Sequence, residues 1–243
     1  MNRTFPVEWL KLRRSRIGFI LAALPVLSLL IACANFYANR SVLENGWYSL
    51  WSQASLFYGT FFLPVLIAIC CAFVCRLEHQ NRNWDMVLAA PVSAASVIGA
   101  KLAVVGLLIL FAQAFFMLLY GLAGLLFTLG SFPGETLSWA LRGWYASLPI
   151  AALQLLLSMR TRSFAAPVGL GLCAVLAGLG FYVAKLGLFF PFSLLAIGMC
   201  ALNQEPLSGG ENLLFWLMAT GFILLFTSLT VHRMKNKDVS AGS

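Results

Sequence analysis

The sequence predicts an all-α polytopic membrane protein. Hydrophobic residues make up 61% of the 243-residue chain and charged residues only 10%, with a mean hydropathy of +0.89. An average soluble domain has about 25% charged residues. The apolar runs are long and lack the period-2 alternation of barrel strands, and an isolated segment in hydrocarbon satisfies its backbone groups only as a helix. We therefore expect one six-helix transmembrane domain over residues 17–231.

Residues 1–16 precede the first apolar run and are predicted to form a cytoplasmic interfacial helix. Phe5, Trp9 and Leu12 fall at i, i+4 and i+7, which places them on one helical face, and charged residues occupy other positions. An alternative interpretation is a basic flank that only fixes the membrane orientation, and the two are compatible.

Six apolar runs follow, and about 20 residues of helix cross the roughly 30 Å of hydrocarbon. The third run is the longest, so we expect it to tilt or to extend past the bilayer. The fourth contains Arg142 near its outer end, from which a long side chain reaches the interface. The predicted spans are Ile17–Tyr37, Leu56–Cys75, Ile98–Phe127, Ser138–Ser158, Phe164–Ala184 and Leu213–Val231.

The distribution of lysine and arginine predicts the orientation of these spans. With both termini in the cytoplasm, every basic residue except Arg40, Arg142 and Lys185 lies on the cytoplasmic side, while the acidic residues divide evenly. Positive residues concentrate on the cytoplasmic side of membrane proteins. The net charge of +8 is therefore attributed to membrane orientation rather than to nucleic-acid binding, and residues 232–243 are predicted to form a cytoplasmic tail.

The apolar stretch 186–202 is treated separately because it contains Pro191 and only Lys185 separates it from the fifth run. As a seventh span it would place the basic tail outside, against the positive-inside rule. We predict instead an outer, re-entrant hairpin over residues 185–212, whose backbone needs protein or a cavity to satisfy it. A spanning helix is the alternative at this point.

The polar loop 76–97 has the pattern of a short amphipathic helix. Leu77, Trp84 and Leu88 fall at i, i+7 and i+11 on one helical face, and Pro91 then restricts the helicity of the residue before it. Such a helix presents an apolar knob that fits a groove on a soluble partner. The alternative interpretation is an ordinary surface loop.

The sequence lacks the motifs of an enzyme. There is no G-x-x-x-x-G-K-[ST] loop to hold ATP phosphates, no G-x-S-x-G and no H-E-x-x-H. The six cysteines lie in or beside apolar runs without metal-ligand spacing, so we interpret them as small core residues. Gln113 and Gln154 lie inside predicted spans and are expected to form interhelical hydrogen bonds. We expect no catalytic group and no cofactor in this chain.

This layout resembles the ABC-2 type permeases of ATP-binding-cassette transporters. The resemblance is carried by the N-terminal helix with Glu8, by the loop with Glu78, Trp84 and the run 88–92, by Lys101, and by the four spans that follow. Among these permeases the chain looks most like the small subunits of lantibiotic-immunity and bacitracin-resistance exporters.

The resemblance implies a site and partners. A separate ATPase subunit, which holds ATP and magnesium, would dock on the loop 76–97, and the residues implied in coupling are Leu77, Glu78, Trp84, Leu88 and Pro91. Arg160 and Arg162 form a possible second cytoplasmic contact, or they only fix orientation. The permease would pair with itself or with a similar subunit in the bacterial plasma membrane.

The implied function is export of an amphipathic, lantibiotic-like antimicrobial peptide, which gives immunity or resistance. Export of another lipid-like or drug substrate is an alternative. A membrane scaffold or sensor subunit without transport is a second alternative, although the polar loops are short for a sensing domain. An ion-coupled carrier is disfavoured because no acidic residue falls in the middle of a span.

Overall fold

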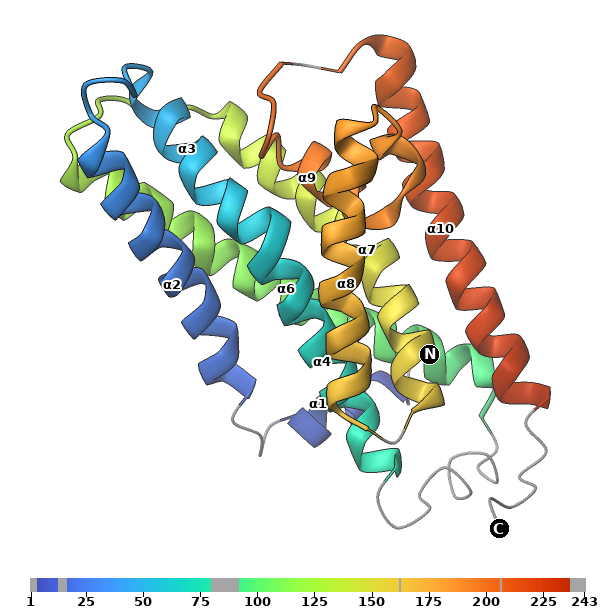
Figure 1. Cartoon of the computed structure of the whole chain (residues 1–243). Coiled ribbons are helices and arrows are strands. Elements are labelled where there is room, and N and C mark those ends of the chain that lie inside the picture. Colours follow the sequence, from blue (N-terminus) through green and yellow to red (C-terminus); the bar gives the residue numbers. More distant parts are fainter. Residues whose placement is uncertain (1–3, 13–16, 80–91, 162, 206, 237–243) are drawn as a thin grey trace.

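The structure, a computed structural model, describes residues 4–12, 17–79, 92–161, 163–205 and 207–236. Within these residues every regular element is helical, which confirms the all-α prediction. The long helices run side by side in one bundle, and the short helix α1 lies at one end of it (Figure 1). The α-helices are α1 (Thr4–Leu12), α2 (Ile17–Ala38), α3 (Gly46–Phe57), α4 (Leu63–His79), α6 (Ala94–Leu126), α7 (Glu135–Arg160), α8 (Ala165–Val183), α9 (Pro191–Gly198) and α10 (Gly209–Asn236).

Five helical segments of the described chain are long and apolar enough to cross a membrane, and they correspond to five of the six predicted spans. These segments are Ile17–Ala38, Gly46–Arg76, Ala94–Leu126, Ala165–Val183 and Gly209–Met234. The remaining predicted span, 138–158, forms α7, which has 26 residues and packs against α4, α6, α9 and α10. Arg142, Pro149 and Gln154 lower the hydropathy of α7, and it is not among the five.

The second membrane-spanning segment begins well before the predicted boundary at Leu56. The helix starts at Gly46 and continues through α3, a π-helical segment η1 (Tyr58–Phe62) and α4. Serine, glutamine and tryptophan make residues 46–55 less apolar than an ordinary span, but Trp47 and Trp51 are buried against the bundle. Packing of these two rings, rather than hydropathy, therefore accounts for the earlier start.

Aromatic side chains from α3, η1 and α6 form the centre of the bundle. The rings of Tyr58 and Phe116 stack with their centroids 4.0 Å apart, and Trp51 meets Tyr120 edge to face at 5.1 Å. Offset-stacked and edge-to-face pairs add to the stabilisation from burial itself. The centre therefore holds α3 against α6, while α2, α8 and α10 keep large exposed apolar faces on the outside.

The stretch 186–202 does not form a long helix. It forms a 3-10 turn, η2 (Gly187–Phe189), and the eight-residue helix α9, and at 1.5 Å per residue α9 is about 12 Å long. That length is too short for a seventh span. α9 is buried against α7 and α8, and its last turn is held by a hydrogen bond that Trp51 Nε1 donates to Met199 O (2.9 Å).

Two glycines allow this close approach of α9. A Cβ at Gly143 on α7 would lie 2.3 Å from Met199 Cγ, and one at Gly59 in η1 would lie 2.8 Å from Met199 Sδ. Real Cβ atoms do not come so close, so both positions need glycine for Met199 to fit between α7 and η1. The buried position of α9 thus depends on glycines far away in the sequence.

Helix ends from distant parts of the chain meet at the end of the bundle that holds α1 (Figure 1). Thr4 Oγ1 donates to Ser96 O (3.4 Å), which ties α1 to the start of α6. Val97 and Ile98 pack against Met234 in the last turns of α10, with Met159 of α7 beside them. The first and last helices of the chain therefore share one end of the bundle with the two ends of the 76–97 loop.

Candidate functional site

Four charged side chains meet inside this end of the bundle, and we call them the ion cluster: Glu8 and Lys11 of α1, Glu78 of α4 and Lys101 of α6. Lys101 Nζ donates to Glu78 Oε1 (2.7 Å), to Glu8 Oε2 (2.9 Å) and to Val74 O (3.3 Å). Lys11 Nζ donates to Glu8 Oε1 and to Glu78 Oε1, both at 2.7 Å. The ion cluster therefore joins three helices through two shared carboxylates.

Local sequence places each member of the ion cluster. Glu8 and Lys11 are three residues apart and share a face of α1. Glu78 lies in the last turn of α4, and Lys101 lies about two turns into α6, so both side chains reach the same level from opposite sides of the 76–97 loop. The pairing is a tertiary one, because 23 residues separate Glu78 from Lys101 and 93 separate Glu8 from Lys101.

The ion cluster is buried. The side chain of Lys101 is 0% exposed, that of Glu78 is 1% exposed and that of Glu8 is 7% exposed, whereas Lys11 is partly exposed. An unpaired charge at such depth would cost several kcal/mol, so burial requires that the two positive and two negative charges balance. Their arrangement therefore works as a unit, in which the loss of a fully buried charge is expected to cost most.

Burial alone would raise the pKa of the Glu78 carboxyl. The charge and hydrogen bond of Lys101, supported by those of Lys11, outweigh this effect and hold the pKa of Glu78 below its ordinary value. Its second oxygen, Oε2, is buried and has no hydrogen-bond partner among the described residues. Glu78 is therefore an ionised group with one oxygen free for a rearranged contact.

The structure places only part of the predicted coupling site. Trp84, Leu88 and Pro91 lie outside the described residues, and Leu77 lies in the last turn of α4 with a side chain that is not described. Glu78 points into the bundle and not toward a surface on which a soluble protein could dock.

The face of α1 that we predicted from Phe5, Trp9 and Leu12 packs mainly against the bundle. Leu12 is buried, Phe5 is partly buried, and Trp9 is 39% exposed and stacks on Phe5 with ring centroids 6.3 Å apart. Glu8 lies on this buried face, so the expectation that charges keep to the other positions is wrong for Glu8. The attraction of Lys101 explains why a carboxylate is tolerated there.

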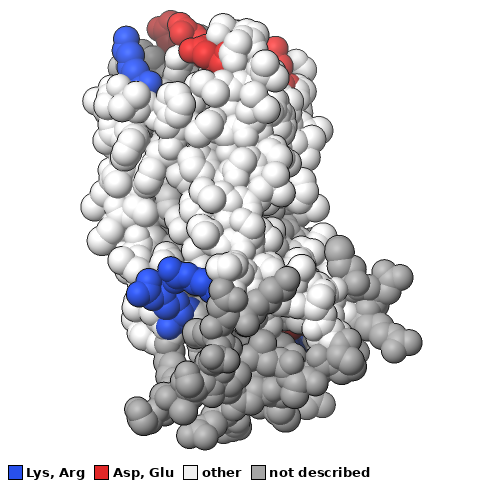
Figure 2. Space-filling view, turned by 90° about the vertical axis from the view of Figure 1, so that its right-hand side faces the viewer, with Lys and Arg blue, Asp and Glu red and all other residues white. Residues whose placement is uncertain are grey.

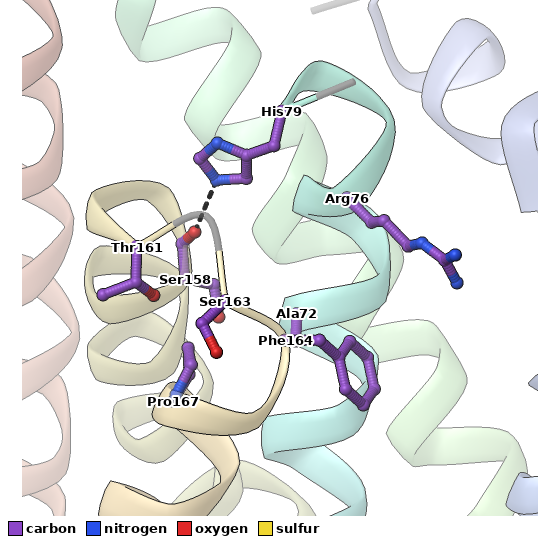
Figure 3. A pocket seen from close by; sticks show the side chains of 8 residues that line it. All are labelled: Ala72, Arg76, His79, Ser158, Thr161, Ser163, Phe164 and Pro167. Atoms are coloured by element: carbon purple, nitrogen blue, oxygen red, sulfur yellow. Dashed lines mark hydrogen bonds between the residues drawn. The ribbon is translucent and has the colours of Figure 1, made fainter. Parts of the chain in front are cut away.

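The predicted second contact lies beside the end of α4. Arg160 is exposed at the C-terminal end of α7, and Arg162 lies outside the described residues. A pocket of about 170 Å³ lies between this junction and α4, and its lining includes Arg76 and His79 of α4 and Thr161 and Phe164 of the junction (Figure 3). His79 Nε2 donates to Ser158 O (2.8 Å), which links the two elements across the pocket.

Sequence reasoning missed the ion cluster as a structure, although Glu8, Glu78 and Lys101 were all named within the resemblance. The available signal was Lys101 itself, which is a cation placed inside a 33-residue apolar helix. A lysine at that depth needs a carboxylate from another segment.

The two predicted interhelical glutamines differ. Gln113 Nε2 donates to Ala140 O (3.3 Å) and so joins α6 to α7, as expected. The prediction for Gln154 is wrong, because neither its Nε2 nor its Oε1 has a hydrogen-bond partner among the described residues.

A comparison with protein families supports the fold and the layout of the chain. The model of a family described as ABC-2 family transporter protein matches residues 4–180, which include α1, the ion cluster and the helices through most of α8. No curated protein matches the sequence. The match covers more than half of the chain, and the chain therefore belongs to the ABC-2 transporter family.

Proposed function

We propose that this chain is the membrane-spanning permease subunit of a bacterial ATP-binding-cassette exporter. It crosses the plasma membrane six times with both termini in the cytoplasm, and α7 is the sixth span beside the five apolar segments. It pairs with an identical or similar permease, and a separate ATPase supplies the energy. Family membership and the five apolar helices support the transport class and the multi-pass arrangement.

The charges at the two ends of the bundle support this orientation. At the end with α1, the described cations Lys11, Arg76, Lys101, Arg160 and Arg233 outnumber the acids Glu8 and Glu78. Acidic side chains gather at the opposite end (Figure 2); the described ones there are Glu44, Glu135, Glu205 and Glu211. By the positive-inside rule the end with α1 is cytoplasmic. The short helix α9 then belongs to an outer hairpin over residues 185–212 that enters from outside and returns.

The observation that carries the proposal is the ion cluster. The loop 76–97 connects the last turn of α4 to the start of α6, and Lys101 joins these two helices to each other and to α1. A force applied to the loop by a docked ATPase would therefore move α1, α4 and α6 as one body. Such a unit would transmit a movement of the ATPase to the membrane-spanning helices.

The proposed substrate is an amphipathic antimicrobial peptide that the exporter removes from the membrane. The wide exposed apolar faces of α2, α8 and α10 suit substrates or a second permease that approach through the lipid. This substrate class is favoured by the resemblance to lantibiotic-immunity exporters, and a drug or another lipid-like molecule is the alternative.

Charged substitutions in the loop test the proposed function. The full chain would be expressed with its companion ATPase, and Trp84→Asp with Leu88→Asp is expected to abolish co-purification of the ATPase and peptide resistance without changing the elution volume of the permease. Val42→Asp is the matched control, because Val42 is 78% exposed in the loop between α2 and α3 at the other end. Intact coupling in the double variant, or labelling of residue 84 from outside the cell, would refute the proposal.

A further inference from the structure

Arg142 on α7 is a half-buried cation near the end of the bundle opposite the ion cluster. It lies seven residues after Glu135, the first residue of α7, which corresponds to about 10 Å along the helix. Its guanidinium carbon lies 5.2 Å from the centre of the Phe215 ring on α10. The cation is therefore sandwiched where α7 and α10 pack together, about a third of the way along α7.

The guanidinium of Arg142 is not satisfied by the protein. Its Nε and Nη2 are covered, and neither has a hydrogen-bond partner among the described residues. The salt bridges among the described residues join Lys11 and Lys101 to Glu8 and Glu78, and no described carboxylate pairs with Arg142. Contact with one aromatic face offsets only part of the cost of removing this charge from water. An oxyanion from outside the protein would supply both missing elements, the charge and the acceptors.

Neighbouring side chains indicate that such an oxyanion is carried by a lipid. Tyr145, one turn further along α7, packs on Trp216 of α10 with ring centroids 4.9 Å apart, and its hydroxyl hydrogen-bonds Thr220 Oγ1 (2.8 Å). Paired tyrosine and tryptophan rings beside a cation are typical of the headgroup level of a bilayer. Leu217 and Leu224, which follow Phe215 along α10, are 61% and 65% exposed and offer an apolar surface for acyl chains.

We propose that Arg142 binds the phosphate of an anionic phospholipid beside the contact between α7 and α10. The partial exposure of Arg142 leaves a path to the guanidinium, and a change of its rotamer would turn the covered N–H groups toward phosphate oxygens. A planar guanidinium binds phosphate with two parallel hydrogen bonds, which a lysine does not reproduce. Lipid binding at this site needs neither an ATPase nor a transported substrate, so it is tested independently of the proposed function.

Native mass spectrometry of the full chain in detergent tests the site with four probes: phosphatidylglycerol, diacylglycerol, oleate and inorganic phosphate. Wild type is expected to retain phosphatidylglycerol and not the other three, because the site recognises a phosphate attached to acyl chains. Arg142→Gln is expected to weaken phosphatidylglycerol binding by about ten-fold or more. Arg142→Lys, which keeps the charge, is expected to bind phosphatidylglycerol with an affinity between those of wild type and Arg142→Gln. If Arg142→Gln does not fold, Arg142→Lys is the variant that tests the site.

The matched control is Arg40→Gln. Arg40 also lies over an aromatic ring at this end of the bundle, 5.6 Å from the centre of Phe127, but it is exposed. Its replacement is expected to leave phosphatidylglycerol binding unchanged. Equal affinity of wild type and the Arg142 variants would overturn the proposal, and so would retention of diacylglycerol or of free phosphate as strong as that of phosphatidylglycerol. Binding of oleate as tight as that of phosphatidylglycerol would overturn the assignment to phosphate.

Discussion

Lys101 Nζ lies 2.7 Å from Glu78 Oε1, and this pair joins α6 to the last turn of α4 across the loop between them. Both side chains are almost completely buried, so the pair depends on its geometry and on the neighbouring charges Glu8 and Lys11. A buried ion pair contributes little net stability relative to apolar residues, but it becomes costly when one partner is lost. The contact between α6 and the last turn of α4 is therefore expected to be lost when either Lys101 or Glu78 is replaced.

Lys101→Met is expected to lower the stability of the bundle by about 3–5 kcal/mol. Methionine fills a similar volume but leaves the carboxylates of Glu8 and Glu78 buried with only the partly exposed Lys11 to balance their charges. The measurement is thermal unfolding of the purified protein in detergent, followed by size-exclusion chromatography with fluorescence detection. Lys11→Met is the control, because Lys11 is 26% exposed and water replaces part of its role; its loss should be less than half as large. Equal losses in the two variants would contradict the central position assigned to Lys101.

Low pH is expected to destabilise the fold by protonating Glu78. Its pKa in the folded chain is below the ordinary value of 4.5, so the ionised group stabilises the fold fully above about pH 4.5. That contribution disappears as the pH falls through the lower, folded pKa. Melting curves between pH 7 and pH 3 should show Glu78→Gln less stable than wild type at pH 7 and the difference narrowing below pH 4.5.

The exposed carboxylate Glu44 provides the control for this pH dependence. Glu44→Gln changes a residue in the loop between α2 and α3 at the opposite end and should leave the wild-type dependence between pH 7 and pH 3 intact. If Glu78→Gln keeps a constant difference from wild type over the whole range, ionisation of Glu78 does not contribute to stability.

Two glycines one turn apart on α6 are expected to respond differently to alanine. A Cβ at Gly124 would lie 2.0 Å from Trp47 Cζ3, whereas one at Gly121 would have nothing within 4 Å. Gly124→Ala must displace the buried ring of Trp47, which also packs against Tyr120. The substitution should lower the free energy of unfolding by about 1–3 kcal/mol. Gly121→Ala should be neutral or slightly stabilising, because alanine favours the helix. The same melting assay measures both, and a tolerated Gly124→Ala would mean that Trp47 packs elsewhere.

The long helices were predictable because one physical requirement dominates them. About 20 apolar residues without a charge have few alternatives in a membrane, so both ends of α2 and of α8 fall within one residue of the predicted bounds of their spans. The start of the second span was not predictable in this way. Trp47 and Trp51 belong to it through burial against α6 and α9, which hydropathy along the chain does not record.

The ion cluster was not predictable as a contact for the same reason. Glu8, Glu78 and Lys101 are separated by tens of residues, and only the packing of α1 and α4 on α6 brings them together. The charge count treated Lys101 as one more cytoplasmic cation that fixes orientation. Its burial adds a structural role to that interpretation. The stretch 186–202 shows the opposite case, since the charge of the tail argued against a long seventh helix there, and the α-helix in this stretch has only eight residues.

Gln154→Met is expected to raise stability by about 1 kcal/mol, because the amide of Gln154 is buried without a hydrogen-bond partner among the described residues. Methionine has a similar shape and no such requirement. Gln113→Met is the matched control and should be destabilising, since it removes the bond to Ala140 O that joins α6 to α7. A comparable loss in both variants would show that Gln154 does have a partner. If Gln154→Met raises the melting temperature as expected and peptide resistance falls, the amide of Gln154 serves transport. A bundle selected only for stability would gain from removal of this unsatisfied amide.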